Sequence, residues 1–438
     1  MGYLLNVAYL ALIAAALPWL LYQRLRHGKY RGGWREKFLG LLPLRSGKAP
    51  CIWLHAVSVG EVNLLLPLVE RWQRLHPAWA VVISTTTQTG FQLAKKRYSQ
   101  HTVVYCPLDF TWAVRRAMRA LRPDLLVLSE LELWPNLIAA AKEHGAKVAV
   151  INGRLSEKSF RGYRRVRWLL SLVLPQIDAI AVQNEEYSAR FLALGATPSA
   201  VIVTGSVKFD GARTDRGAPE TQRLARLAGI QREDIVFLAG STQESEESLA
   251  LDVFQRLADE FPKLKLILVP RHLERFGDVA ALLNQRGLPW QRRSELPGAG
   301  KGARVLLVDA VGELGHWWGT AEIAFVGGSL TRRGGQNMIE PAGYGAAISF
   351  GPNTWNFRDV VAMFLRRDAA VVVRDSHELE FFVRRCLSDP AFATNLGQRA
   401  QALVLEQQGA ADRTIRLLEE LVATDATRGK HVRPSVAA

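Results

Sequence analysis

Acidic side chains follow two apolar runs in the first half of the sequence, at positions where they could act as general bases. Glu61 comes after the apolar run 51–55 and opens a helical pattern. The helix dipole stabilises a carboxylate in the first turn of a helix as the anion. Glu130 and Glu132 follow another apolar run, next to Trp134. Two interpretations stay open: the acids could do chemistry, or they could serve as a favourable helix charge and as partners of internal cations.

The second half of the sequence contains groups that could bind a nucleotide phosphate. Arg271 follows the apolar run 265–270, and a guanidinium at a strand end suits bidentate recognition of phosphate or carboxylate. Glycine loops precede predicted helices, where free backbone N–H groups form an anion site. Glu340 could accept hydrogen bonds from a ribose diol. Glycine is also common in ordinary tight turns, so only several loops at one sheet edge favour a nucleotide. The predicted phosphate loops contain Gly240, Ser241, Gly328, Ser329 and Gly335.

Several well-known chemical motifs are missing from the sequence. It has no G-x-G-x-x-G after a first strand, no G-x-x-x-x-G-K-[ST], no H-E-x-x-H and no D-x-D pair. These absences disfavour dinucleotide oxidoreductases, P-loop ATPases and zinc proteases. The three cysteines, Cys51, Cys106 and Cys386, are far apart, so neither a disulfide framework nor a zinc knuckle is expected. We predict no bound metal and no cofactor.

The composition is that of a basic globular protein. Lys and Arg number 56 against 41 acidic residues among 438, which gives a formal net charge of +15, and 48% of the residues are hydrophobic. These proportions exclude a disordered or fibrous chain, and the length suggests two domains. The basic residues gather near the N-terminus rather than along a reading helix, which disfavours nucleic acid as the partner.

An uncharged apolar segment at 3–22 is long enough to cross a bilayer, since a helix rises about 1.5 Å per residue. It lacks the basic N-terminal region of a secretory signal peptide. The positive-inside rule places its basic flank, and hence the body, on the cytoplasmic side of the membrane. We predict a single-pass or interfacial anchor, with a cleaved signal peptide or a buried helix as alternatives. The flank contains Arg24, Arg26, Lys29, Arg31, Arg35 and Lys37.

A second basic segment, 158–168, alternates cations with aromatic residues. This spacing is typical of an interfacial helix whose cations meet lipid phosphates, so we expect Arg161, Arg164 and Arg165 to contact an anionic acceptor or membrane. A solvated helix face with its aromatic rings in the core would give the same pattern.

Apolar runs alternate with amphipathic stretches along the body, which predicts α/β architecture with parallel sheets covered on both faces. The polar stretch 210–220 is the best linker, because the rhythm restarts after it. We therefore expect two doubly wound Rossmann-like domains that face a central cleft. The predicted divisions are an anchor and its flank at 1–28, an N-terminal domain at 29–212, a C-terminal domain at 213–423 whose last helices cross back, and a flexible tail at 424–438.

Long ordered motifs give the sequence a resemblance to a known family. They are WLHAVSVGE (53–61), SELELWPNLI (129–138), LILVPRHLERF (266–276) and AFVGGSLTRRGGQNMIEPAGYG (324–345). At these residues the chain resembles the 3-deoxy-D-manno-octulosonic acid (Kdo) transferases, also called WaaA or KdtA. The resemblance implies a GT-B glycosyltransferase at the cytoplasmic face of the inner membrane. It implies transfer of Kdo from CMP-Kdo to the lipid A precursor lipid IVA, with inversion and without a metal.

The resemblance also implies roles for individual residues. Glu61 corresponds to the catalytic base, and Glu130 to an acid of the sugar or acceptor region. The acceptor region is expected to include Ser58, Gly60, Glu130, Glu132, Arg161, Arg164 and Arg165. The CMP site is expected to include Pro270, Arg271, Val311, Gly312, Glu313, Asn337, Met338, Ile339 and Glu340.

The chain departs from the usual family pattern at four positions. Gln243 and Gln336 replace histidines, Met338 replaces a proline and Leu131 a threonine. Glutamine can hydrogen-bond but cannot carry a positive charge, so a histidine-based phosphate contact is not expected here. Two alternatives remain: another nucleotide-sugar GT-B transferase that acts on a different membrane lipid, and a homologue that binds an anionic ligand without chemistry.

Overall fold

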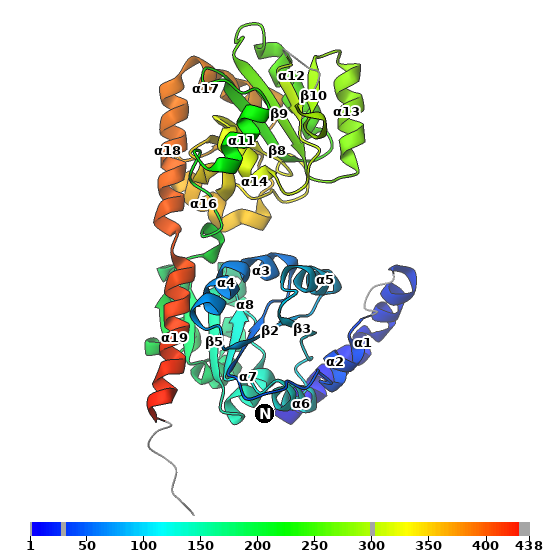
Figure 1. Ribbon diagram of the computed structural model, residues 1–438. Helices are drawn as coiled ribbons and strands as arrows, with labels where there is room; N and C mark the ends of the chain where they lie inside the picture. The colour runs from blue at the N-terminus through cyan, green and yellow to red at the C-terminus, as the bar shows by residue number, and fades with distance from the viewer. Residues whose placement is uncertain (1, 28–31, 298–302, 429–438) are drawn as a thin grey trace, which may run out of the picture. The chain divides into compact units, whose positions relative to one another are not determined.

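The computed structural model describes residues 2–27, 32–297 and 303–428, which form two compact units (Figure 1). One unit contains the chain up to Asp210 together with the segment from Gln408 onward, and the other is Gly211–Gln407. We expected the domains to end at 212 and 423, with the last helices crossing back to the first domain. In the structure the chain rejoins the first unit at Gln408.

The first unit is built on a seven-stranded sheet in which all neighbouring strands are parallel. The strand order is β3-β2-β1-β4-β5-β6-β7, so the direction of winding reverses between β1 and β4. Ligands of open α/β sheets bind beyond the carboxyl ends of the strands at such a reversal. The strands are β1 (Cys51–His55), β2 (Ala80–Thr85), β3 (Thr102–Tyr105), β4 (Leu125–Ser129), β5 (Lys147–Gly153), β6 (Ala179–Val182) and β7 (Val201–Val203).

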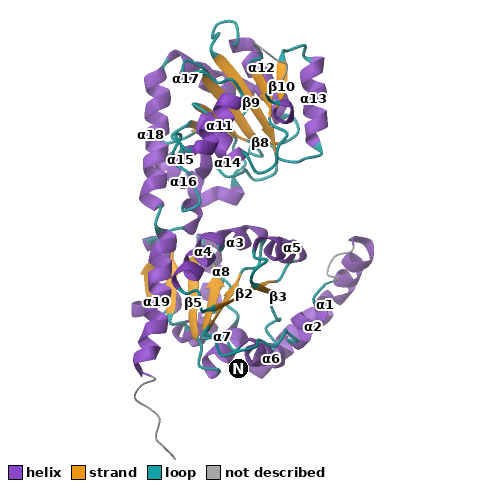
Figure 2. Cartoon of the chain, in the orientation of Figure 1, coloured by secondary structure: helices purple, strands orange, loops and turns teal. Residues whose placement is uncertain are grey.

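Helices cover both faces of this first sheet (Figure 2). One face packs against side chains of α6, α7, α9 and α10, and the other against α3, α4, α5 and α19. The last of these comes from the C-terminal end of the chain and supplies Ala411, Ile415 and Leu418 to the core. The helices are α1 (Gly2–His27), α2 (Trp34–Leu39), α3 (Val59–Leu64), α4 (Leu66–Leu75), α5 (Gln88–Arg97), α6 (Thr111–Leu121), α7 (Pro135–Glu143), α8 (Glu157–Arg165), α9 (Arg167–Val173), α10 (Glu185–Leu194) and α19 (Ala410–Arg428).

The second unit repeats the design with the strand order β10-β11-β9-β8-β12-β13-β14, which reverses between β8 and β12. The strands are β8 (Ile235–Thr242), β9 (Leu264–Pro270), β10 (Trp290–Arg292), β11 (Val305–Leu307), β12 (Ile323–Val326), β13 (Ala347–Phe350) and β14 (Val371–Val372). The helices are α11 (Pro219–Leu227), α12 (Glu246–Leu257), α13 (Arg275–Gln285), α14 (Leu314–Trp317), α15 (Ile339–Gly343), α16 (Arg358–Arg366), α17 (Ser376–Ser388) and α18 (Pro390–Gln407).

The predicted α/β fold with two parallel sheets is confirmed. The pattern of apolar runs missed β3 and β10, which are the outermost strands at one edge of each sheet. Both are short, and β10 is nowhere fully buried, so neither gives the long apolar run on which the prediction depended.

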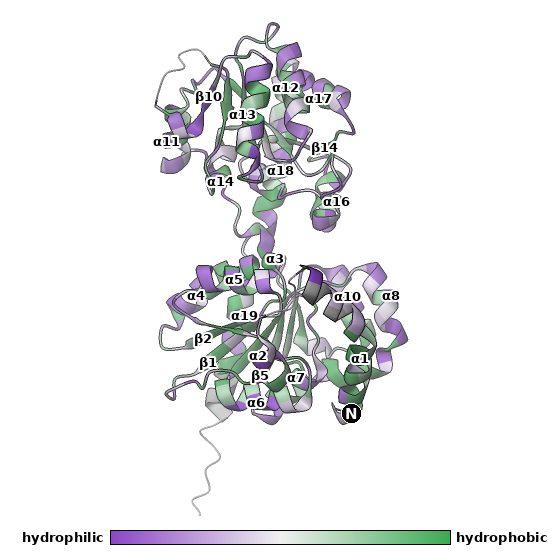
Figure 3. Ribbon diagram, turned by 90° about the vertical axis from the view of Figure 1, so that its right-hand side faces the viewer, coloured by the Kyte–Doolittle hydropathy of each residue, from purple (hydrophilic) through white to green (hydrophobic). Residues whose placement is uncertain are grey.

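The N-terminal helix α1 contains an 18-residue apolar stretch, Gly2–Trp19, that is long enough to cross a membrane and is 6% buried. Figure 3 colours most of it green, for hydrophobic. The predicted basic residues Lys29 and Arg31 lie outside the described residues, as does the part of the predicted tail at 429–438. Residues 424–428 of that tail continue α19.

Candidate active site

Glu61 lies in the first turn of α3, directly beyond the carboxyl end of β1. Ser58 is the N-cap of α3 and accepts a hydrogen bond from the Glu61 backbone N–H over 3.3 Å. The Glu61 carboxylate accepts from the Ser58 hydroxyl over 2.7 Å and from the Val57 N–H over 2.9 Å. These reciprocal bonds are a variant of the capping box, and they fix the carboxylate at the end of the strand.

Burial raises the pKa of Glu61 above its ordinary value, and the hydrogen bonds from Ser58 and Val57 oppose that rise. The negative charge of Glu130 raises it further. A carboxylate with a raised pKa accepts a proton more readily, which is the property that a general base needs.

Glu130 and Glu132 follow β4, the neighbour of β1 at the reversal of the first sheet. Glu130 has a left-handed backbone with φ of 57°, which is uncommon for a residue other than glycine. Its carboxylate lies 3.5 Å from the Lys208 ammonium. The Glu132 carboxylate accepts a hydrogen bond from the Trp134 indole N–H over 2.9 Å. The structure therefore brings two predicted acids to the strand end beside the Glu61 loop.

Burial and the charges of neighbouring acids raise the pKa of both Glu61 and Glu132. Burial raises the pKa of Glu132 to about 7, with further contributions from the charges of Glu61 and Glu130. Near neutral pH Glu132 is partly protonated, which reduces the repulsion around Glu61. We name Glu61, Glu130 and Glu132 the carboxylate cluster. No three His, Cys, Asp or Glu side chains in residues 2–27, 32–297 and 303–428 come together as metal ligands.

His55, the last residue of β1, is a neighbour of the cluster that the sequence analysis did not select. It is fully buried, and its Nδ1 lies 2.9 Å from the Ser84 hydroxyl. Burial lowers its pKa to about 4, so the ring is neutral at physiological pH. Among the described residues its Nε2 has no hydrogen-bond partner. The signal in the sequence that could have identified His55 is a polar residue at the end of the apolar run 51–55.

In the second unit, Arg271, Asn337 and Glu340 come together. The Asn337 amide donates to the Glu340 carboxylate over 3.0 Å and accepts from the Ile339 N–H over 3.1 Å. Burial raises the pKa of Glu340, and the neighbouring Arg213 and Arg271 charges oppose this. Arg271 follows Pro270 at the end of β9 and has an exposed side chain. Within the described chain no hydrogen bond or ion pair is found for its guanidinium, which leaves it available to an anion.

Other predicted CMP-site residues have mixed surroundings. Glu313 is bound by the Arg293 guanidinium through two bonds of 2.8 and 2.7 Å, so its carboxylate already has a cationic partner. Arg293 was not predicted. Met338 and Ile339 have buried side chains, which leaves only their backbone for a ligand. In front of α14, Val311 is 73% exposed and Gly312 has φ of 89°.

The predicted phosphate loop at Gly328 and Ser329 needs a correction. Their N–H groups donate to the buried Glu246 carboxylate over 2.7 and 3.0 Å, and the Leu330 and Gln243 N–H groups donate to it over 2.9 Å each. Successive backbone N–H groups form a concave anion site, but here an internal carboxylate occupies it. The expectation of free N–H groups was therefore wrong at these two residues.

The remaining predicted loop residues mainly permit close packing. A Cβ on Gly240 would lie 2.4 Å from the Trp318 ring, and Ser241 is buried with a left-handed φ of 55°. Gly335 also has a positive φ, 77°, and its N–H donates to the Gly328 carbonyl over 2.8 Å. Gln243, which stands where the family usually has a histidine, is buried.

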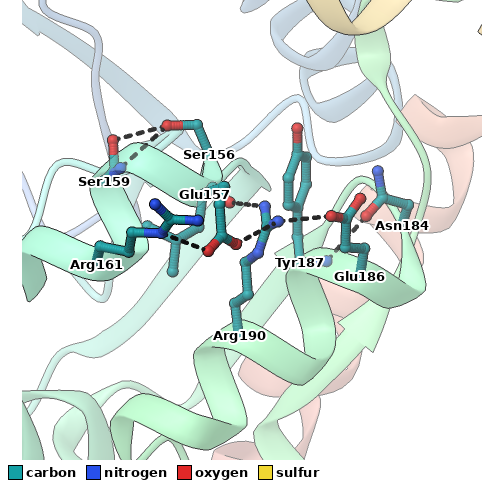
Figure 4. Close-up of polar contacts among 9 residues, drawn as sticks. Ser156, Glu157, Ser159, Arg161, Asn184, Glu186, Tyr187 and Arg190 are labelled. Atoms are coloured by element: carbon teal, nitrogen blue, oxygen red, sulfur yellow. Dashed lines mark hydrogen bonds and ion pairs between the residues drawn. The ribbon is translucent and has the colours of Figure 1, made fainter. Parts of the chain in front are cut away.

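The basic helix α8 lies on the first unit (Figure 4), and its cations have internal partners. Arg161 pairs with Glu157 over 2.9 Å, and Glu157 also binds Arg190 of α10 over 3.0 Å. Arg164 lies over the Phe160 ring. Within the described residues, the Arg165 side chain has no hydrogen bond or ion pair with the residues of the site.

The aromatic residues of this segment do not all face outward. Phe160 and Tyr163 pack against the core of the first unit, whereas Trp168 is 69% exposed. The alternative of rings in the core is therefore confirmed for the first two residues. The negative charge of Glu132 adds to the burial that raises the pKa of Tyr163, so α8 lies near the carboxylate cluster.

Comparisons with known proteins show the family of the chain. The family model for 3-deoxy-D-manno-octulosonic-acid transferase (kdotransferase) matches residues 32–211. A 3-deoxy-D-manno-octulosonic acid transferase of Haemophilus influenzae is 32% identical over 405 residues, which are 87% of this chain and 94% of that protein. The chain belongs to the Kdo transferase family. It is accordingly a glycosyltransferase.

A second relative gives the same result. The 3-deoxy-D-manno-octulosonic acid transferase of Bordetella pertussis is 33% identical over 428 residues, 93% of this chain and 96% of that protein. Among solved structures, a glycosyltransferase from Rickettsia africae matches 86% of this chain and 98% of its own with a TM-score of 0.54 and 11% identity. At that identity the match supports the GT-B fold alone.

Proposed function

We propose that this Kdo transferase uses CMP-Kdo as donor and a lipid IVA-type phosphorylated glycolipid as acceptor, with inversion at the anomeric carbon and Glu61 as the base. The observation that carries the proposal is the position of Glu61. It is held by Ser58 and Val57 at the reversal of the first sheet, next to two further acids. Donors of this kind leave as a nucleotide, so the acceptor hydroxyl needs a base and the nucleotide needs compensating charge.

In the proposed step, Glu61 removes the proton from an acceptor hydroxyl while its oxygen attacks the anomeric carbon of Kdo. The new carbon–oxygen bond forms as the bond from that carbon to the cytidylate phosphate oxygen breaks, and the electron pair leaves with the phosphate. Glu61 is then protonated and CMP carries the negative charge. Partial protonation of Glu132 near neutral pH limits the repulsion that a negative donor would meet beside the cluster.

The proposed donor site uses Arg271, Asn337 and Glu340. The exposed Arg271 guanidinium suits the cytidylate phosphate, since arginine binds phosphates through two parallel N–H bonds. The half-buried Glu340 carboxylate, fixed by Asn337, suits a ribose hydroxyl. The backbone of Met338 and Ile339 completes the site.

The acceptor is proposed to come from a membrane. The apolar helix α1 provides the attachment, and basic residues such as Arg35 and Lys37 would face anionic headgroups. By the positive-inside rule the body works on the cytoplasmic side of the inner membrane.

Incubation with CMP-Kdo and lipid IVA, followed by mass spectrometry of the lipid, tests this function. We expect the acceptor mass to rise by one or more Kdo residues. Tight CMP binding without any mass gain would instead favour a binding homologue that has lost its chemistry. Transfer from another nucleotide sugar would favour a different GT-B specificity.

A further inference from the structure

A small apolar groove lies between α1 and the body of the first unit. Its volume is about 150 Å³. The side chains Tyr9, Leu12 and Ile13 of α1 form one wall, and Leu108, Asp109, Phe110 and Trp134 form the other. Five of these seven side chains are aliphatic or aromatic without a charge or hydroxyl, so the groove suits an apolar occupant.

Two polar residues of α1 hold it against the body. The Asn6 amide donates to the Thr111 hydroxyl over 2.7 Å and accepts from the Thr111 N–H over 3.1 Å. The Tyr9 hydroxyl donates to the Asp109 carboxylate over 3.1 Å. Asn6 is 5% exposed, whereas the other faces of the helix are open. These bonds give the groove a wall of fixed position.

Asp109 does not make the groove polar. Its carboxylate accepts hydrogen bonds from the Asn136 N–H over 3.0 Å and the Leu137 N–H over 2.8 Å, in the first turn of α7. It therefore caps that helix from a distance. With Tyr9 as a third donor, the Asp109 carboxylate has three hydrogen-bond partners within the protein.

Trp134 connects the groove with the carboxylate cluster. Its ring lines the groove, and its indole N–H donates to Glu132 over 2.9 Å. On the helix side, the groove adjoins a surface of α1 too apolar to be left in water. That surface contains the exposed side chains Leu4, Val7, Leu10, Leu12, Leu17 and Trp19.

We propose that this groove binds an acyl chain of the acceptor lipid and so positions the sugar headgroup at the carboxylate cluster. The inference rests on the proposed function, because it takes a membrane glycolipid as the acceptor. We choose an acyl chain as the occupant because the groove adjoins the exposed apolar face of α1, where a lipid would enter. Trp134 lines the groove and also binds Glu132 of the carboxylate cluster, which would act on the headgroup of that lipid.

Two substitutions that fill the groove from opposite walls, Ile13→Trp and Leu108→Trp, test the proposal. Each would be assayed on lipid IVA and on the same phosphorylated disaccharide after complete deacylation. We expect kcat/KM to fall about tenfold on lipid IVA only, the factor that goes with losing the burial of about two methylene groups. Leu75→Trp is the matched control, because Leu75 is 55% exposed at the end of α4, outside both the groove and α1.

The outcomes separate the groove from the proposed function. Equal losses on both acceptors, or no loss in either groove variant, would overturn the groove. No transfer to either acceptor by the unaltered protein would overturn the function instead. In that case a phospholipid with a diazirine-bearing acyl chain, in anionic vesicles, still probes the groove. Crosslinks to Ile13 or Leu108 would support it, and crosslinks confined to Leu4, Val7 and Leu10 would contradict it.

Discussion

The carboxyl edges of the two sheets both hold wholly or partly buried acids, but the acids have different partners. In the second unit, Glu246 accepts four backbone hydrogen bonds and Glu313 is bound by Arg293. In the first unit, Glu61 and Glu132 have few donors, and the negative charges of neighbouring acids add to the burial that raises the pKa of both.

The difference separates structural acids from candidate catalytic ones. A buried charge is costly unless it is paired or fully hydrogen-bonded, so an acid with all its partners inside the protein stabilises the fold. A cluster of like charges is retained at a cost to stability, and such clusters occur at functional sites. This criterion supports our proposal that the first unit supplies the base and the second unit binds the donor.

The largest effect is expected for Glu61→Gln. The amide keeps the size of the side chain but cannot take a proton, so kcat should fall by about 10²–10⁴-fold. CMP binding, measured by calorimetry, should be unchanged. Glu70→Gln, an exposed position on the next helix, serves as control. Near-normal turnover in Glu61→Gln would remove Glu61 from the role of base.

The next largest effect is on stability, for Glu246→Gln. The amide oxygen of the glutamine can still accept two of the four N–H bonds, but its NH2 group faces the other two donors and cannot accept from them. The free energy of unfolding should therefore fall by about 3 kcal/mol. Thermal unfolding measures this against Glu244→Gln, an exposed acid two residues earlier. If the two variants melt alike, the distinction between structural and catalytic acids fails for the second unit.

A smaller effect is expected for Arg271→Ala. Loss of a charged hydrogen bond to phosphate should weaken CMP binding by about tenfold or more, with little change in thermal stability because the side chain has no internal partner among the described residues. Arg367→Ala, which removes an exposed ion pair with Glu406, is the control. An unchanged dissociation constant for CMP would place the phosphate elsewhere.

The smallest effect concerns pH and Glu132. The pKa of the Glu132 carboxyl is about 7 in the folded protein, which is above its value in the unfolded chain. Its contribution to stability is therefore complete below the unfolded pKa and is lost as the pH rises through 7. The melting temperature of Glu132→Gln should therefore fall less between pH 5 and pH 8 than that of the unaltered protein. A parallel fall in both proteins would show that the pKa of Glu132 is not raised in the folded protein.

The sequence predicted the main features of this site. The strands before the three acids were predicted because parallel strands buried on both faces are continuous apolar runs, and Glu61, Glu130 and Glu132 come shortly after such runs. Glu246 was missed because nothing in a glycine loop says whether its N–H groups meet a ligand or an internal acid. Arg293 and His55 were missed because their partners lie far away in the chain or on another strand.

The sequence by itself determined the two α/β halves and the motifs that identify the family, since both depend on local periodicity and on ordered residues. The tertiary structure decided which acids have partners, because burial and hydrogen bonds come from segments distant in the chain. It also decided that α19 returns from the far end of the chain to cover the first sheet, and that Asn6 and Tyr9 fasten α1 beside Trp134. Apolar patterns show that a face must be covered, and only the folded chain shows what covers it.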